Sequence, residues 1–416
     1  MDAVDKLRFL NQQTLLEPAE EAESAARPAG WVDPHRRAPC GHSPAALRAA
    51  FDSGPQAPAL KSSLVRKPSA LGIHQAALPG GGRLALLKTM LTSACERNCY
   101  YCPFRAGRNY RRATFKPDEM AQVFTQIAAG GAANGLFLSS GVAGGGARTQ
   151  DRLLDTIDIL RAKHHFGGYV HLKLMPGVER DQVRRAMQLS DRVSINLEAP
   201  TTARLQRLAP QKVFVEELLQ PLRWVDEIRR GEAPRGAFKG RWPSVVTQFV
   251  VGAVGEDDLE ILTASSYLLR QLRLARVYYS AFRPVPQTPL EALPAENPWR
   301  EHRLYQASFL LRDYGFDLED LPFTPAGRLP LEVDPKLGWA AANLTERPVE
   351  LNRADRPTLL RVPGIGPKSA DTLLQARRRG RLRDLRDLQQ LGINANRAAP
   401  YILLDGRAPN HQPRLF

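Results

Sequence analysis

Three of the four cysteines in this chain lie within eight residues of one another, at Cys95, Cys99 and Cys102. Thiolates are soft ligands, and they bind zinc, copper or the iron atoms of iron–sulfur clusters. A secreted domain stabilised by disulfides would instead distribute an even number of cysteines along a short chain. In a chain of 416 residues, three closely spaced thiols therefore predict a metal or iron–sulfur site.

The spacing Cys-x3-Cys-x2-Cys favours a [4Fe–4S] cluster over a single zinc ion. Three thiolates on one loop can ligate three irons and leave the fourth open to a small molecule, which is a catalytic arrangement. Zinc would take a fourth protein ligand at a characteristic spacing, and no His or Cys follows closely. Three unligated thiols are the other alternative. Cys40 has His35 and His42 nearby but no second cysteine, so a metal site there is the weaker interpretation.

The elements that must position this loop alternate regularly from residue 83 onward. Strand-like segments are Arg83–Leu91, Gly135–Ser139, Gly168–Leu174, Arg192–Leu197, Ser244–Val251 and Ala275–Phe282. Helical segments between them are Pro117–Ala129, Asp151–His165, Asp181–Leu189, Val213–Arg230 and Glu256–Leu272. Such alternation predicts an α/β fold, a partial (βα)6 barrel of the TIM type, with functional groups at the carboxyl ends of its strands. On the third strand, His171 or Lys173 could face the interior or lie at a solvated strand end.

The barrel is expected at residues 83–295. Residues 1–82 are predicted to be an N-terminal extension that is partly disordered, with an amphipathic start at Leu7–Leu16 and loop or disorder over much of 17–80. The predicted regions after the barrel are a helical connector and Pro-rich linker (296–345), an all-α helix-hairpin-helix domain (346–405) and a tail (406–416).

Pro363-Gly364-Ile365-Gly366 has the residues of a tight turn between two helices. Glycines permit backbone conformations that other residues resist, and turn amides beside a helix N-terminus can form an anion site. The segment resembles the helix-hairpin-helix motif, which implies contact with a nucleic-acid backbone. The residues implied in this contact are Gly364, Ile365, Gly366, Lys368 and Ser369. Leu391-Gly392-Ile393-Asn394 resembles a degenerate second copy, and a plain helical turn or a protein contact are the alternatives.

Positive charge also favours a polyanionic partner. The chain has 58 Lys and Arg against 43 Asp and Glu, and residues 351–416 alone have 13 against 5. A composition in which Arg replaces Lys throughout is the alternative explanation. Arg105 and Arg108 could bind substrate phosphates, or they belong to a solvated turn. No apolar run approaches the roughly 18 residues of a membrane helix, so we expect a cytoplasmic protein with no membrane partner.

The cysteine loop resembles the signature of the radical S-adenosylmethionine (SAM) superfamily, Cys-x3-Cys-x-aromatic-Cys, with Tyr101 as the aromatic residue. The resemblance implies a [4Fe–4S] cluster whose open iron binds SAM, and a 5′-deoxyadenosyl radical that abstracts hydrogen from a substrate. It also implies an electron donor such as flavodoxin or ferredoxin. The residues it implies for SAM binding are Tyr101, Ser139, Ser140, Gly141, Asn196, Glu198, Val251 and Gly252. The segment at Ser139 lacks the Glu of the family's Gly-Gly-Glu pattern, and a salt bridge at the barrel rim is the alternative for Glu198.

The cysteine loop together with the C-terminal hairpin resembles a narrower group, the radical SAM proteins assigned to DNA modification or repair. This resemblance implies nucleic acid, in the first place DNA, as the partner. One alternative is a radical SAM enzyme that acts on RNA or a small molecule and uses the hairpin module for docking. Another is an iron–sulfur base-excision glycosylase, with Lys368 and either Asp384 or Asp387 as catalytic residues. A non-catalytic iron–sulfur DNA-binding or redox-sensing protein is the third.

Overall fold

The computed structural model describes residues 2–14, 71–77 and 82–410, so Cys40 and its neighbouring histidines lie outside the described residues. The chain divides into two compact units. Unit 1 comprises Met1–Gly255 and Leu272–Pro298, and unit 2 comprises Glu256–Gln271 and Trp299–Phe416.

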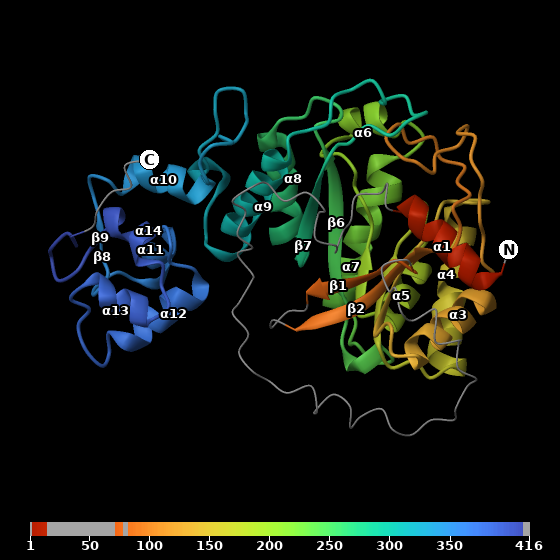
Figure 1. The fold of residues 1–416 in the computed structure, drawn as a ribbon, viewed down its shortest axis with the longest axis horizontal. Coiled ribbons are helices and arrows are strands. Elements are labelled where there is room, and N and C mark those ends of the chain that lie inside the picture. Colours follow the sequence, from red (N-terminus) through yellow and green to blue (C-terminus); the bar gives the residue numbers. More distant parts are fainter. Residues whose placement is uncertain (1, 15–70, 78–81, 411–416) are drawn as a thin grey trace. The chain divides into compact units, whose positions relative to one another are not determined.

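A curled, seven-stranded half-barrel sheet forms the centre of unit 1 (Figure 1). Its strands follow chain order: β1 Ile73–Ala77, β2 Arg83–Met90, β3 Gly135–Ser139, β4 Tyr169–Lys173, β5 Arg192–Ser194, β6 Ser244–Val251 and β7 Arg276–Ala281. β1 is antiparallel to β2, and every later strand is parallel to the one before it. The predicted α/β fold with parallel strands is therefore confirmed.

Of the five helices of unit 1 between the parallel strands, the first packs on the second, the second on the third and the third on the fifth, while the fourth contacts a π-helical segment, Phe214–Leu219. The five helices are α3 Pro117–Ala129, α4 Gly146–Asp158, α5 Arg180–Leu189, α6 Thr202–Leu208 and α7 Gln220–Gly231. α3 shows why the sequence folds this way: Pro117 occupies the first turn, and Met120, Val123, Phe124 and Ile127 are buried at helical spacing. α4 begins five residues before the predicted start, and a π-helical segment at Ile159–Lys163 continues it.

The N-terminal region contributes more to unit 1 than the sequence indicates. α1, Ala3–Thr14, buries Leu7 and Leu10 and contacts both β2 and α3. The Lys6 ammonium also lies 2.6 Å from the Glu119 carboxylate of α3. β1 extends the sheet within the segment that we expected to be loop, because pairing with the edge of β2 compensates for its low strand propensity. The sheet therefore begins before the predicted boundary at residue 83.

Unit 2 begins with a helix that the alternation assigns to the barrel, α8, Asp258–Arg270. A buried ion pair explains its place: Arg300 Nε of α9 (Pro298–Asp313) lies 2.7 Å from Asp258 Oδ1. Asp258 Oδ2 also accepts a hydrogen bond from the Leu329 N–H at 2.8 Å. These contacts join the predicted barrel helix to the predicted connector.

The C-terminal part of unit 2 has a hydrophobic core of its own. Its elements are α10 Pro335–Asn343, β8 Val349–Glu350, α11 Arg356–Arg361, α12 Pro367–Ala376, α13 Leu385–Gln390, α14 Ala395–Ala398 and β9 Ile402–Leu403. The two short strands pair in parallel and connect the start of this module to its end. Among all helices that the structure describes, none is long and apolar enough to cross a membrane.

Candidate functional site

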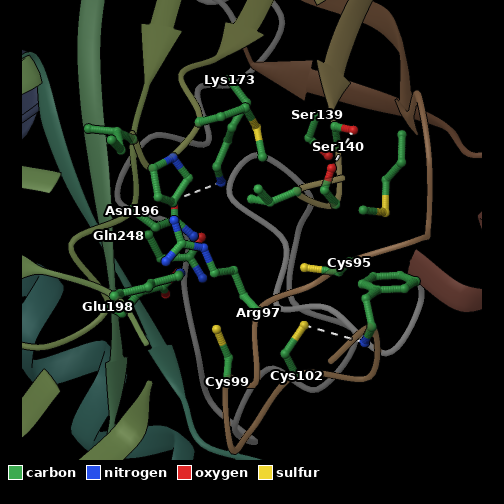
Figure 2. A pocket seen from close by; sticks show the side chains of 18 of the residues that line it. Cys95, Arg97, Cys99, Cys102, Ser139, Ser140, Lys173, Asn196, Glu198 and Gln248 are labelled. Carbon is green, nitrogen blue, oxygen red and sulfur yellow. Dashed lines mark hydrogen bonds and ion pairs between the residues drawn. The ribbon is translucent and has the colours of Figure 1, made fainter. Parts of the chain in front are cut away.

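The cysteine loop follows β2 directly and is fixed by backbone hydrogen bonds. The Leu91 N–H donates to the Ser139 carbonyl at 2.8 Å, and the Tyr100 N–H donates to the Leu208 carbonyl at 2.8 Å. Cys99 is buried, whereas Cys95 and Cys102 are partly exposed, and all three thiols are free of disulfides. The three sulfur-bearing side chains line one end of a cavity (Figure 2).

Arg112 holds the second half of this loop. Its guanidinium donates to the carbonyls of Ser93 at 2.7 Å and Phe104 at 2.8 Å. It also lies over the Tyr110 ring, 3.9 Å from the centroid. The Arg112 guanidinium thus stabilises the conformation of the loop.

Arg105 and Arg108, predicted to bind substrate phosphates, are not among the residues that line the cavity. The Arg108 guanidinium donates to the carbonyls of Pro103 at 2.9 Å and Pro286 at 3.2 Å. Arg105 Nε is buried without a hydrogen-bond partner among the described residues. Two of the five N–H donors of Arg108 are thus used in packing the loop, and its contact with a substrate phosphate stays a prediction.

Ser139, Ser140 and Gly141 continue from the end of β3 into the cavity wall. A Cβ atom at Gly141 would lie 2.3 Å from the Ala94 carbonyl oxygen and 3.1 Å from the Cβ of Cys95. Only glycine permits this approach, so Gly141 allows the end of β3 to support the cysteine loop from behind.

Glu198 lies beyond the carboxyl end of β5, in a backbone conformation with φ +66 that is uncommon for a residue other than glycine. Its carboxylate is buried, and Oε1 accepts a hydrogen bond from Lys212 Nζ at 2.8 Å. Oε2 has no hydrogen-bond partner among the described residues. A strained, buried carboxylate with an unsatisfied oxygen in a cavity wall is typical of a ligand-binding position.

Asn196 lies next to Glu198 in the same wall, and its Oδ1 accepts a hydrogen bond from Lys173 Nζ at 2.7 Å (Figure 2). His171, two residues before Lys173 on the same face of β4, is fully buried. Its ring stacks on Phe137 and shares a 2.8 Å hydrogen bond with Ser194. Both residues thus face the barrel interior, but only Lys173 reaches the cavity.

Lys212 remains charged beside the thiols. Burial lowers its pKa, but Cys99 and Glu198 outweigh burial and hold the pKa above the ordinary value of a lysine. Burial raises the pKa of the Cys99 thiol, and the positive charge of Lys212 partly opposes this effect. Burial, followed by the charge of Glu198, raises the pKa of Tyr101 well above its ordinary value, so the phenol stays neutral. The Lys212 charge favours the thiolate form that metal ligation requires.

The cavity has a volume of about 940 Å³, part of which is open to solvent. The predicted site residues in its wall are Cys95, Cys99, Tyr101, Cys102, Ser139, Ser140, Gly141, Asn196 and Glu198. The polar residues in the wall that were not among the predicted site residues are Lys88, Arg97, Lys173, Lys212 and Gln248.

Val251 and Gly252 are not in this wall. The Val251 side chain is fully buried, and Gly252 has φ +91. A Cβ atom at Gly252 would lie 2.2 Å from the Glu296 carboxylate. The glycine after β6 therefore permits close packing against Glu296, and the contact of this turn with adenine stays a prediction.

Two successive helix–loop–helix pairs lie in unit 2, namely α11 with α12 and α13 with α14. Equivalent positions in the two loops are Gly364 and Gly392, Ile365 and Ile393, and Gly366 and Asn394. Gly364 has φ +85 and Gly392 has φ +72, and both isoleucines are buried. Gly366 and Asn394 are the N-cap residues of α12 and α14.

Ile365 is a core residue and does not present its side chain to a ligand. Its N–H donates to the Val362 carbonyl at 3.1 Å, and its carbonyl accepts a hydrogen bond from Lys336 Nζ at 2.6 Å. Burial lowers the pKa of Lys336 to about 7. Of the residues predicted to bind a nucleic-acid backbone, Lys368 is exposed, whereas Gly364, Gly366 and Ser369 are partly exposed.

Residues 89–231 match the family model described as the radical SAM superfamily. The matched segment begins at the end of β2, includes all three cysteines of the loop and ends with α7. This chain contains a radical SAM domain. Members of the superfamily use a [4Fe–4S] cluster and SAM.

Several solved structures resemble the radical SAM domain at low identity. Methylornithine synthase is 16% identical, with a TM-score of 0.43, over 60% of this chain and 66% of that one. The hydrogenase maturase HydG from Carboxydothermus hydrogenoformans is 13% identical, with a TM-score of 0.42, over 55% and 51%. The chain therefore spans less than two thirds of these structures, and at such TM-scores they carry no information about its substrate. A comparison with curated proteins found no match.

The cavity fits the two cofactors of the radical SAM superfamily. Three thiols on one loop supply the soft ligands of a cluster, and the neighbouring wall carries an unsatisfied carboxylate oxygen. No three ligand side chains among the described residues are placed to hold a single metal ion. The separation of the three thiols is compatible with a [4Fe–4S] cluster, in which each thiolate binds a different iron.

Gly141→Ala should reduce the iron content of the reconstituted enzyme at least about threefold, because the new methyl group would displace the cysteine loop. Gly167→Ala is the matched control, since a Cβ atom there meets nothing within 4 Å. Iron and acid-labile sulfide are measured after anaerobic reconstitution. Equal iron in both variants would show that the close approach of Gly141 does not support the cluster site.

Proposed function

We propose that this radical SAM enzyme modifies or repairs nucleic acid, with DNA as the preferred partner. In the barrel, Cys95, Cys99 and Cys102 would hold the [4Fe–4S] cluster, and the cavity beside them would take SAM. Bound together, the cluster and SAM supply a 5′-deoxyadenosyl radical that abstracts hydrogen from the substrate.

The chain's own residues orient the cofactors and limit access of water. Ser139, Ser140 and Asn196 offer hydroxyl and amide groups to SAM, and Glu198 Oε2 offers an acceptor. Tyr101, held neutral by burial and by Glu198, supplies an aromatic surface beside the thiols. No residue of the wall is assigned to proton or hydrogen transfer.

The duplicated loop in unit 2 is the observation that carries the choice of substrate class. Gly364 and Gly392 adopt left-handed backbone conformations at equivalent positions of two helix–loop–helix pairs. Such turns can bring backbone amides close to a phosphate. Residues 351–416 have a net charge of +8, and the exposed cations of this region include Lys368, Arg379, Arg381, Arg383 and Arg386. This combination supports the proposed helix-hairpin-helix contact with the phosphate backbone.

A radical SAM enzyme needs a source of electrons, and we propose a flavodoxin or a ferredoxin. The glycosylase alternative loses its support, because the cysteines lie in the radical SAM match and far from the hairpin in sequence. The remaining alternative is an RNA or small-molecule substrate, and an experiment must distinguish it from the proposed DNA substrate.

Competition binding tests the substrate class. Labelled duplex DNA is displaced from the reconstituted enzyme by unlabelled duplex DNA, single-stranded DNA or tRNA at one fixed salt concentration. We expect a DNA competitor to be at least about tenfold more effective than tRNA, with an affinity that falls steeply as salt rises. Preference for tRNA, or an affinity that does not depend on salt, would contradict a DNA-backbone contact.

A further inference from the structure

Lys88 is a buried cation in the cavity of the radical SAM domain. It lies on β2, where it pairs in register with Phe137 of β3, two residues before Ser139. Its exposed fraction is 9%, and it lines the same cavity as the three cysteines. Lys88 lies two residues before the carboxyl end of β2, and the carboxyl ends of the strands carry the predicted site residues. Lys88 therefore lies deeper in the barrel than those residues.

No carboxylate compensates the Lys88 ammonium within the described part of the chain. Its Nζ lies 5.6 Å from the centroid of the Phe137 ring. Its charge acts on His74 of β1, whose pKa is lowered by burial and then by the charge of Lys88. A buried ammonium without a counter-charge is unfavourable unless a ligand supplies the charge.

The other cations of the cavity wall have partners. Lys212 Nζ lies 2.8 Å from Glu198 Oε1, and Arg97 Nη2 lies 2.6 Å from Glu217 Oε1. Lys173 donates to the amide oxygen of Asn196. Glu198 is the sole carboxylate in the described wall, and Lys212 already faces it. The wall therefore presents positive charge at Lys88 that its own residues do not neutralise.

Gln248 of β6 adds a second unsatisfied polar group to this cavity. Its exposed fraction is 3%, and its Oε1 has no hydrogen-bond partner among the described residues. β6 is otherwise apolar along most of its length, so a glutamine there is costly without a ligand. A buried cation and a buried amide thus line the same cavity.

We propose that Lys88 binds a terminal phosphate of the substrate and that the Gln248 amide contacts the same molecule. This inference rests on the proposed function, because it takes the cavity as the place where the substrate meets the cofactors. A phosphate held at Lys88 lets the rest of the molecule extend toward the thiols. The phosphate belongs to a phosphorylated nucleic-acid end or to a free nucleotide, since both present the same singly attached group.

The test uses full-length, cluster-containing enzyme with SAM, and it measures binding by anaerobic calorimetry. One arm compares a single-stranded oligodeoxynucleotide with and without a 5′-phosphate, and the other compares thymidine 5′-monophosphate with thymidine. The variants are Lys88→Met, Lys88→Arg and the control Lys163→Met, which removes an exposed charge. Iron content and SAM binding are measured for each variant.

We expect the phosphate to improve binding by about tenfold or more in at least one arm. Lys88→Met should abolish this improvement with iron and SAM binding unchanged, Lys88→Arg should keep part of it, and Lys163→Met should keep it all. A response in the nucleotide arm alone would support Lys88 while contradicting a nucleic-acid substrate. No phosphate effect in either arm, or a Lys88→Met variant that keeps the effect or loses SAM binding, would overturn the inference even if SAM cleavage is normal.

Discussion

Replacing Cys99 with alanine should leave the reconstituted enzyme with almost no iron and no detectable 5′-deoxyadenosine. Cys99 is buried and lies between the other two cysteines in the loop sequence, so only two of the three loop thiolates would be left to hold the cluster. We expect about four irons per chain in the unchanged protein. Iron is determined by colorimetry, and 5′-deoxyadenosine is determined by chromatography after reduction with dithionite in the presence of SAM.

Cys40→Ala is the control for this experiment, because Cys40 is the one cysteine outside the loop motif. It should keep the full iron content and the full rate of SAM cleavage. A Cys99→Ala variant that retains four irons and cleaves SAM would mean that other residues hold the cluster.

Replacing Gly364 with valine should weaken DNA binding by about tenfold or more while the iron content stays normal. Gly364 has φ +85, and a Cβ atom there would lie 2.7 Å from the Asn394 carbonyl oxygen. The substitution therefore distorts the first loop and its packing against the second helix–loop–helix pair. Binding is measured by fluorescence anisotropy with a labelled DNA duplex.

The control for Gly364 is Gly380→Ala in the same unit, where a new Cβ atom meets nothing within 4 Å. Lys368→Gln gives a second measurement that does not depend on strain, because Lys368 is exposed. A plot of the logarithm of the binding constant against the logarithm of the salt concentration should become less steep by about one unit. The loss of one phosphate contact has this effect. Unchanged binding in both Gly364→Val and Lys368→Gln would place the DNA contact elsewhere.

Local sequence patterns could predict the features that depend on neighbouring residues in the chain. The cysteine spacing located the thiols, and the apolar alternation located the six parallel strands. β1 was missed because its five residues form a strand only by pairing with β2. α8 was assigned to the barrel because nothing in its own sequence shows that Asp258 pairs with Arg300.

The parts of the site that were missed, whole residues or the role of a predicted one such as Gly141, depend on contacts between distant segments. Lys212 faces Glu198 from a loop after α6, and no spacing rule connects them. Gly141 matters because the end of β3 approaches Ala94, which only the folded structure reveals. Lys88 and Gln248 could have been found, since a polar residue within an apolar barrel strand is a signal that strand alternation makes visible.

The most direct measurement is deuterium transfer into 5′-deoxyadenosine. The reconstituted enzyme is reduced anaerobically with SAM and with DNA that carries deuterium at its sugar and base carbon positions, and both products are examined by mass spectrometry. We expect deuterium in 5′-deoxyadenosine, together with a mass change in one nucleotide of the DNA. Formation of 5′-deoxyadenosine without deuterium and without any change in the DNA would contradict a radical reaction on nucleic acid.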